Sequence, residues 1–145
     1  IRHKMSTNLQ VFDFANTEPI VPPKEMPLTS MKKLTVGDKT CMSITLEPGW
    51  KWSESVGPNM PSGPMDKCPG THFGIIVKGA LKMTHDDGTV VVAKAGDAYY
   101  CGPGHLAEVE GDEQTVMVEF SQQLAQEYKE VIDAPAAEEA GGEAQ

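Results

Sequence analysis

The sequence is poor in cysteine and in long apolar runs, and each shortage excludes a class of protein. The 145 residues include three cysteines, Cys41, Cys68 and Cys101, without a C-x-x-C pair. An odd, widely spaced set favours a reducing compartment over a disulfide framework, so we expect a cytoplasmic protein. No apolar run approaches the roughly 18 residues that cross a bilayer. The opening IRHKMST has no apolar segment behind its positive charges, so we expect neither a membrane span nor a secretory signal.

Positive charge is also scarce. The chain carries 12 Lys and Arg against 21 Asp and Glu, a formal net charge of −9. Phosphate binding needs clustered Lys and Arg, so a nucleic-acid partner is not expected. Residues 133–145 hold four acids and no base. This tail has too little apolar surface to order itself, and we expect it to be disordered.

The length suits one domain with a core of its own. Residues 1–30 are expected to be irregular, because prolines at 19, 22, 23 and 27 block a continuous helix. Within them, the alternation of Leu9–Phe14 predicts a short strand. Met5 is the expected natural start, which makes residues 1–4 a leftover extension. The folded domain is expected to span residues 31–120.

Turn signals recur at short intervals through residues 31–120. Gly37-Asp38, Asp87-Gly88 and Gly111-Asp112 separate runs rich in apolar and β-branched residues. In KTCMSITL the apolar side chains alternate, as in a strand with one face in a core. Short strands with this punctuation are typical of an all-β sandwich or barrel.

Three further segments complete the outline. GWKWSESV is predicted to continue as a strand, with Trp50, Trp52 and Glu54 on one side. Residues 57–70 contain four prolines and form a long loop, a feature that often belongs to a functional lid. Residues 121–132 predict a C-terminal helix with Ser121 as its cap and with Leu124, Tyr128 and Val131 on one face.

Two glycine-punctuated segments each carry one histidine. THFGIIVKG places His72 seven residues before Gly79, and GDAYYCGPGH ends at His105. Together with LEPG at Leu46–Gly49 and the intervening DDGTVVVAKAGD, these segments resemble, in order, the motifs of the cupin superfamily. The resemblance runs from about residue 46 to residue 120. It implies a small single-domain β-barrel related to jelly rolls, and it implies pairing into a homodimer.

The chain departs from the cupin pattern at the expected metal ligands. His72 stands where the first motif has its glutamate, and the histidine pair before it is absent. Counting back reaches Lys67 and Met65, or Cys68 and Asp66 with shorter spacing. Alternatively, the position of the histidine pair falls earlier, near Glu54, and the proline- and glycine-rich loop at residues 57–70 is an insertion after it. In the second motif the usual histidine position falls near Ala107, two residues after His105.

A divalent metal is nevertheless one reading of the site. Imidazole is a good ligand for transition metals, which need three or four protein donors for tight binding. His72 and His105 supply two donors. Cys68, Glu54, Asp66 or Tyr100 could supply a third, and Cys68 is the one we select. Zinc, iron, nickel or manganese is the expected ion. In the alternative reading both histidines are hydrogen-bonding groups of a metal-free barrel, and Cys68 is an inert loop residue or a nucleophile paired with His72.

The candidate ligand pocket consists of Trp50, Trp52, Gly74 and Cys101, although the tryptophans also suit a core. We expect the barrel to hold a small organic molecule, with or without the metal. If the protein is an enzyme, the resemblance implies metal-assisted oxidation, isomerisation or lyase chemistry, with Tyr100 or Glu54 transferring protons. The alternative is a non-catalytic small-molecule-binding or sensor module without metal.

Overall fold

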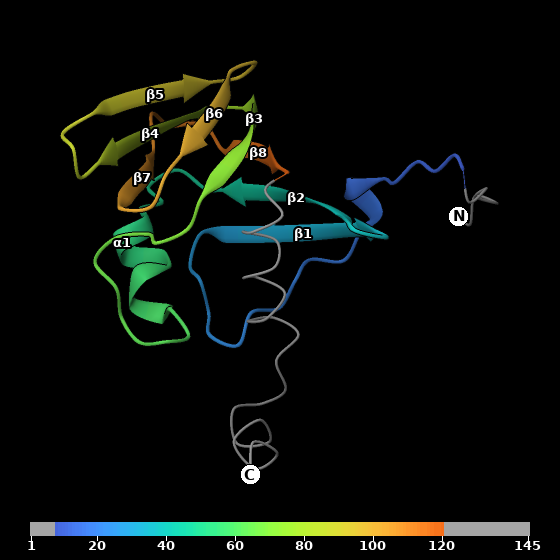
Figure 1. Cartoon of the computed structure of the whole chain (residues 1–145), viewed down its shortest axis with the longest axis horizontal. Helices are drawn as coiled ribbons and strands as arrows, with labels where there is room; N and C mark the ends of the chain where they lie inside the picture. The colour runs from blue at the N-terminus through green and yellow to red at the C-terminus, as the bar shows by residue number, and fades with distance from the viewer. Residues whose placement is uncertain (1–7, 121–145) are drawn as a thin grey trace, which may run out of the picture.

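The computed structural model describes residues 8–120, which fold into two antiparallel β-sheets (Figure 1). The larger sheet has the strand order β1 (Thr29–Val36), β2 (Lys39–Leu46), β8 (Thr115–Glu119), β3 (His72–Lys78) and β6 (Ala98–Cys101). The smaller sheet has the order β5 (Val90–Lys94), β4 (Ala80–His85) and β7 (His105–Val109). The predicted antiparallel all-β fold is thereby confirmed in outline.

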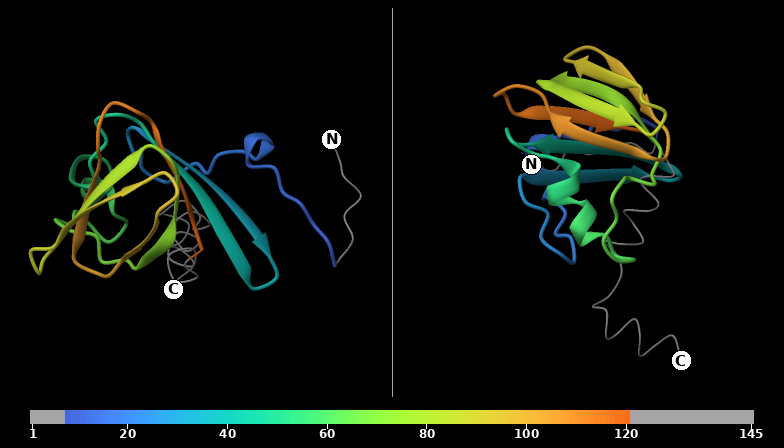
Figure 2. Two further views of the ribbon diagram at one scale, coloured as in Figure 1. Left: turned by 90° about the horizontal axis from the view of Figure 1, so that it is seen from above. Right: turned by 90° about the vertical axis from the view of Figure 1, so that its left-hand side faces the viewer.

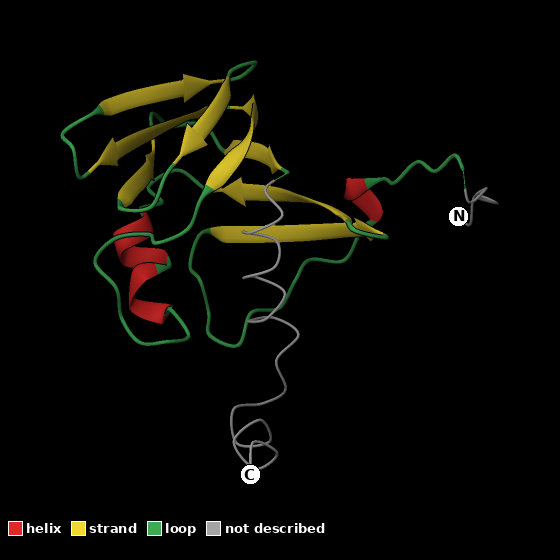
Figure 3. Cartoon of the chain, viewed as in Figure 1, coloured by secondary structure: helices red, strands yellow, loops and turns green. Residues whose placement is uncertain are grey.

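The helices of the described residues are short. They are α1 (Trp52–Ser55) and the 3-10 turns η1 (Phe14–Asn16) and η2 (Gly57–Asn59). Figure 3 shows them in red at the margins of the sheets, and Figure 2 gives two further views of the arrangement. Helix α1 contacts β7, so it lies close to one end of the smaller sheet.

The core lies between the two sheets. Met42, Leu46 and Ile76 of the larger sheet belong to one buried cluster with Leu81 and Met83 of the smaller sheet. These side chains follow the alternation of their strands, because successive residues of a strand point to opposite faces. The inward face of β8 is less apolar, since Thr115, Met117 and Glu119 are its buried residues. A buried carboxylate thus enters the core.

The turns follow the sequence signals. Val36 pairs with Lys39, so Gly37-Asp38 forms the two-residue turn of the β1–β2 hairpin. Gly37 has a φ of 60°, a conformation that favours glycine. Between β4 and β5, the N–H of Gly88 donates to the carbonyl of His85. The turns predicted at Gly37-Asp38 and Asp87-Gly88 are confirmed.

Two predicted strands are wrong. The chain turns just before and within GWKWSESV, where the carbonyl of Glu47 accepts from the N–H of Trp50. The segment then becomes helix α1 from Trp52. Its buried residues Trp52, Ser55 and Val56 follow the i, i+3, i+4 spacing of a helix rather than alternation.

The N-terminal segment Leu9–Phe14 forms no ladder either, and Leu9 and Val11 are exposed. The Asp13 carboxylate accepts from the N–H of Ala15 and caps the 3-10 turn that begins at Phe14. This local capping replaces the predicted strand. The helix predicted at residues 121–132 and the tail at 133–145 lie outside the described residues.

Candidate metal centre and adjoining pocket

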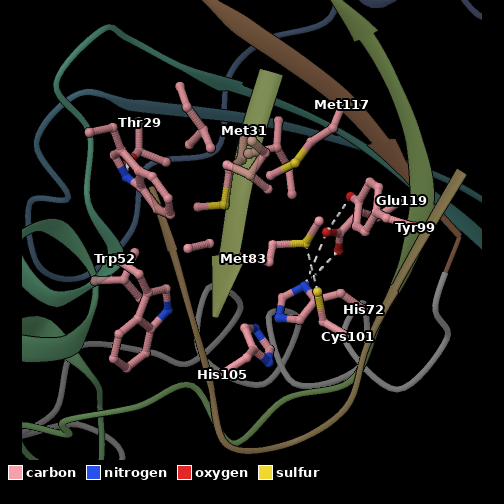
Figure 4. A pocket seen from close by; sticks show the side chains of 16 residues that line it. Thr29, Met31, Trp52, His72, Met83, Tyr99, Cys101, His105, Met117 and Glu119 are labelled. Atoms are coloured by element: carbon pink, nitrogen blue, oxygen red, sulfur yellow. Dashed lines mark hydrogen bonds and ion pairs between the residues drawn. The ribbon is translucent and has the colours of Figure 1, made fainter. Parts of the chain in front are cut away.

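Three side chains from separate parts of the chain converge near one end of the two sheets. Cys68 comes from the long loop, His72 begins β3 and His105 begins β7. One potential ligand atom from each lies within 4.8 Å of the other two. The two imidazole rings meet edge to face, with their centroids 4.9 Å apart. Figure 4 shows both histidines at the lower end of the interior.

Backbone hydrogen bonds fix Cys68 against the turn that precedes His105. The N–H of Cys68 donates to the carbonyl of His105, and the N–H of Gly104 donates to the carbonyl of Cys68, each at 2.9 Å. An ion pair between Lys67 and Asp86 adds a second link from the loop to the β4–β5 turn. The long loop is therefore tied down where it carries its cysteine.

Glu119 orients the imidazole of His72. The Nδ1 atom of His72 lies 3.0 Å from Oε1 and 3.1 Å from Oε2 of Glu119, which is buried. Because a carboxylate accepts, Nδ1 carries the proton of this hydrogen bond. The opposite ring nitrogen, Nε2, lies 3.3 Å from Sγ of Cys68. His72 is thus held between a carboxylate and a thiol.

His105 is oriented in the same sense by the backbone. Its Nδ1 lies 2.6 Å from the carbonyl oxygen of Gly102, which can only accept, so Nδ1 donates. Because Nδ1 is engaged with Gly102, Nε2 is the nitrogen left to interact with Cys68 or with a metal. Both histidines therefore present Nε2 as the nitrogen available to a ligand.

Tyr99 completes the surroundings of Glu119. Its hydroxyl donates to Oε1 of Glu119 at 2.7 Å. Burial and the negative charge of Glu119 raise the pKa of Tyr99, so the phenol stays protonated. Gly74 makes room for this pair, because a Cβ there would lie 2.9 Å from the Tyr99 hydroxyl and 3.1 Å from Cα of Glu119. Gly74 therefore accommodates the pair and does not line the cavity.

The two buried cysteines have opposite electrostatic surroundings. Burial opposes ionisation of Cys68, but hydrogen bonds from His105 and His72 outweigh it and lower the pKa of the thiol to about 6. Burial, reinforced by the charges of Glu119 and Cys68, raises the pKa of Cys101 to about 12. Cys101 instead donates to Sδ of Met83 at 2.9 Å. At neutral pH only Cys68 is set up as a thiolate.

The charge of His72 is coupled to that thiolate. Burial alone would lower the pKa of His72, but hydrogen bonds to Cys68 and Glu119, together with their negative charges, raise it to about 10. In the metal-free protein, His72 is thus an imidazolium between two anions. A metal ion would take the place of the proton on Nε2.

The donor set suits a transition metal. In tetrahedral zinc sites the metal–sulfur and metal–nitrogen bonds of about 2.3 and 2.0–2.1 Å place adjacent ligand atoms roughly 3.5 Å apart. The observed 3.3 Å between Sγ of Cys68 and Nε2 of His72 is close to that spacing. Glu119 behind His72 and the Gly102 carbonyl behind His105 are the outer hydrogen-bond partners that metal-binding histidines usually have. Thiolate and imidazole ligands favour zinc, iron or nickel over manganese, which prefers oxygen.

A cavity of about 50 Å³ lies on the inner side of the histidines. Its walls are mostly apolar; they include Met31, Ile44, Leu46, Leu81, Met83 and Met117. His72, His105, Tyr99 and Glu119 line it as well, as Figure 4 shows. This volume holds about three or four water molecules, so the cavity admits only a small molecule as it stands.

No family model matches the sequence. No curated protein matches it either. Among solved structures, the polyketide cyclase RemF from Streptomyces resistomycificus is similar, with 15% identity and a TM-score of 0.52 over 77% of this chain and 79% of that chain. A cupin-like protein from Thermotoga maritima has 18% identity and a TM-score of 0.46 over 74% and 86% of the two chains. An oxalate decarboxylase has 22% identity and a TM-score of 0.49, over 75% of this chain and 28% of its own.

The similarity to RemF, with a TM-score above 0.5, concerns the fold alone. His105 and Ala107, the position where the second cupin motif usually has its histidine, both line the cavity. Sγ of Cys68 lies 3.3 Å from Nε2 of His72, and Cys68 lies in the stretch before His72 where the motif would have its histidine pair. The two segments that resemble the cupin motifs thus bring His72 and His105 together, while Cys68 is not part of that pattern. No helix among residues 8–120 is long and apolar enough to span a membrane.

The structure places the remaining candidates differently. Trp50, Trp52 and Cys101 line the cavity, and the indole N–H of Trp50 donates to Oγ1 of Thr29 at 2.9 Å. Glu54 lies exposed on α1, where it pairs with Lys51. Tyr100 is 67% exposed and points away from the cavity. The two proton-transfer candidates are therefore separated from the cavity.

Tyr99 and Glu119 are the residues that sequence reasoning missed. Tyr99 shares the inward face of β6 with Cys101, so the placement of Cys101 in the pocket already implied Tyr99 rather than Tyr100. Glu119 shares the inward face of β8 with Met117 in the run TVMVE. In the sequence, the signal for Glu119 was an acidic residue at a position that alternation places on the inward face of an apolar strand.

Proposed function

We propose that this cupin binds one transition-metal ion through Sγ of Cys68 and Nε2 of His72 and His105, beside a cavity that admits a small organic molecule. The proposal takes the two sheets as the walls of a cupin barrel. One observation carries it: each imidazole donates from Nδ1 to a fixed acceptor, which leaves both Nε2 atoms beside one low-pKa thiol. Zinc, iron and nickel fit this set best.

Three protein donors leave a coordination position for water or for a substrate oxygen. When bound, the metal would polarise that oxygen or lower the pKa of a bound water. Glu119 holds the proton on Nδ1 of His72 and so fixes which nitrogen faces the ion. Tyr99 and Glu119, rather than Tyr100 and Glu54, are the proton-transfer candidates, because they line the cavity. Oxidation, isomerisation and lyase chemistry are the reaction classes for a screen.

A non-catalytic binding or sensor module without metal is the competing function. It is supported by the small size and apolar walls of the cavity. In that case the histidines would serve as hydrogen-bonding groups for the ligand. A ligand that raises the melting temperature of chelator-treated protein as much as that of metal-loaded protein would favour this module.

A second candidate function follows from the order of contacts at Cys68. Sγ of Cys68 is 3.3 Å from Nε2 of His72, and Nδ1 of His72 is 3.0 Å from Glu119. In space, a thiol contacts an imidazole base, which in turn contacts an orienting carboxylate. This order of contacts is the arrangement of a cysteine nucleophile. Iodoacetamide separates the two roles: alkylation of Cys68 with loss of iodide should be fast in metal-free protein and blocked by stoichiometric zinc if the metal site is real.

The homodimer and the cytoplasmic location stay predictions. Light scattering on the purified chain measures the first, since it gives the molar mass directly. Cell fractionation of the host measures the second.

Elemental analysis by mass spectrometry tests the metal proposal. Untagged protein purified without chelators should contain close to one zinc, iron or nickel per chain. Cys68→Ser and His105→Ala should each lower the bound metal several-fold, with the β-sheet circular dichroism unchanged. Cys41→Ser is the matched control, because Cys41 lies on β2 outside the metal cluster. A wild-type protein that stays metal-free after incubation with each ion would contradict the proposal.

A further inference from the structure

The outer face of the larger sheet carries an apolar patch over β3 and its neighbours. Phe73, Ile75 and Val77 on β3 are 54%, 42% and 57% exposed. Phe73 pairs with Tyr100 of β6, and Ile75 pairs with both Ala98 of β6 and Val118 of β8. We call these six residues the outer patch. Contiguous apolar surface of this kind commonly marks a site where something binds.

The described chain ends beside this patch. Phe120 follows β8, and its N–H donates to the carbonyl of Phe73 at 3.0 Å. Its side chain is partly exposed and lines a shallow cavity with residues of β1 and β2, including Leu34 and Cys41. The described residues therefore end at the margin of the outer patch. The remaining 25 residues of the chain start here.

The sequence after Phe120 has the pattern of a segment that would cover such a face. In SQQLAQEYKEVI, the residues Leu124, Tyr128 and Val131 recur at i, i+4 and i+7. Polar residues such as Gln123, Glu127 and Glu130 occupy other positions. A 12-residue helix is about 18 Å long, and strands in a sheet lie about 4.8 Å apart, so it can cross about four strands.

We propose that residues 121–132 fold back and dock their apolar face on the outer patch of the same chain. The occupant is this segment rather than another molecule for three reasons. It is tethered at the margin of the patch through Phe120. Its apolar spacing matches a surface helix, and an isolated helix of this length is marginal in water without such a partner. Its acidic remainder at 133–145 would stay in solvent. The competing occupant is a second copy of the chain.

Four variants of the full-length chain test the docking. Leu124→Asp alters the segment and Ile75→Asp alters the outer patch. Gln123→Asp is the control on the polar side of the segment. Val91→Asp is the control for the sheet, because Val91 is a similarly exposed strand residue of β5 in the other sheet.

Docking predicts that Leu124→Asp and Ile75→Asp each lower the melting temperature by roughly 4 °C or more and raise the fluorescence of an added apolar dye several-fold. The double variant should lose little more than either single variant, because both remove one contact. Both controls should resemble wild type, and none of the variants should change the molar mass. Additive losses, or no loss in Leu124→Asp, would overturn the proposal. So would a wild-type dimer that Ile75→Asp dissociates, since the patch would then lie between two copies.

Discussion

Nδ1 of His72 lies 3.0 Å from Oε1 of Glu119, a residue 47 positions further along the chain. This contact decides which nitrogen of His72 faces Cys68, because the carboxylate holds the proton on the opposite side of the ring. The same contact helps to raise the pKa of His72, through the hydrogen bond and the negative charge of Glu119. An imidazole without this partner could turn or change tautomer, and Nε2 would no longer be held toward the thiol.

Replacement of Glu119 by Gln should weaken zinc binding by about 10- to 100-fold, the usual cost of losing an outer hydrogen-bond partner of a metal-binding histidine. The glutamine keeps the volume of the side chain but removes the charge that stabilises the His72 Nδ1–H. Competition titration with a chromophoric chelator measures the affinity. Glu108→Gln, a surface residue paired with Lys82, is the control and should leave the affinity unchanged. Equal affinities for both variants would show that Glu119 does not support the site.

Cobalt should report the sulfur ligand directly. Cobalt-loaded wild-type protein is expected to show a sulfur-to-metal charge-transfer band in the near ultraviolet. Cys68→Ser should lose this band, whereas Cys101→Ser should keep it, because the Cys101 thiol donates to Met83 and has its pKa raised to about 12. A band that survives in Cys68→Ser and disappears in Cys101→Ser would move the metal to the other cysteine.

Removal of the Tyr99 hydroxyl should destabilise the protein, while the same change one residue later should not. Tyr99→Phe deletes a buried donor to Glu119, which costs about 1–3 kcal/mol of unfolding free energy. Tyr100→Phe changes an exposed side chain and should stay within about 0.5 kcal/mol of wild type. Urea denaturation of the two variants measures the difference. A larger loss in Tyr100→Phe would mean that the faces of β6 are reversed.

The metal-free protein should have a stability maximum set by Cys68 and His72. The pKa of Cys68 falls from 9.0 to about 6 on folding, so its contribution is present above pH 9 and is lost as the pH falls through 6. The pKa of His72 rises from 6.5 to about 10, so its contribution is present below pH 6.5 and is lost as the pH rises through 10.

Together, the two shifts place the maximum contribution of the pair between about pH 6.5 and 9, with losses below about 6 and above about 10. Denaturation with urea in the presence of a chelator, repeated across this range, measures the profile. His72→Ala should flatten it on the alkaline side, where the pair loses its proton. A wild-type profile with no alkaline loss would contradict the assigned thiolate–imidazolium pair.

The sequence predicted those parts of the structure that depend on local order. Turn chemistry fixed the β1–β2 hairpin, since Gly37 supplies the positive φ that the turn requires. The order of glycine-punctuated strands led to the cupin resemblance and so to His72 and His105 as neighbours. Helix α1 was missed because Trp50 and Trp52 were assigned to a strand by alternation, although the burial of Trp52, Ser55 and Val56 follows the helical period.

Contacts between distant residues could not be read in this way. Cys68 and His72 are four residues apart, but their contact depends on the bridge between Cys68 and His105, which closes the loop. Glu119 reaches His72 only because β8 lies between β2 and β3, an order of strands that the sequence does not state. The choice of Tyr99 over Tyr100 was available from alternation, which places Tyr99 on the same face as Cys101, but the contact of Tyr99 with Glu119 depends on the order of the strands.

X-ray absorption spectroscopy of the full-length protein loaded with one equivalent of zinc tests the central claim most directly. The account predicts one sulfur at about 2.3 Å and two imidazole nitrogens at about 2.0–2.1 Å, with the sulfur lost in Cys68→Ser. A zinc shell of oxygen and nitrogen alone in the wild-type protein, unchanged in Cys68→Ser, would contradict it.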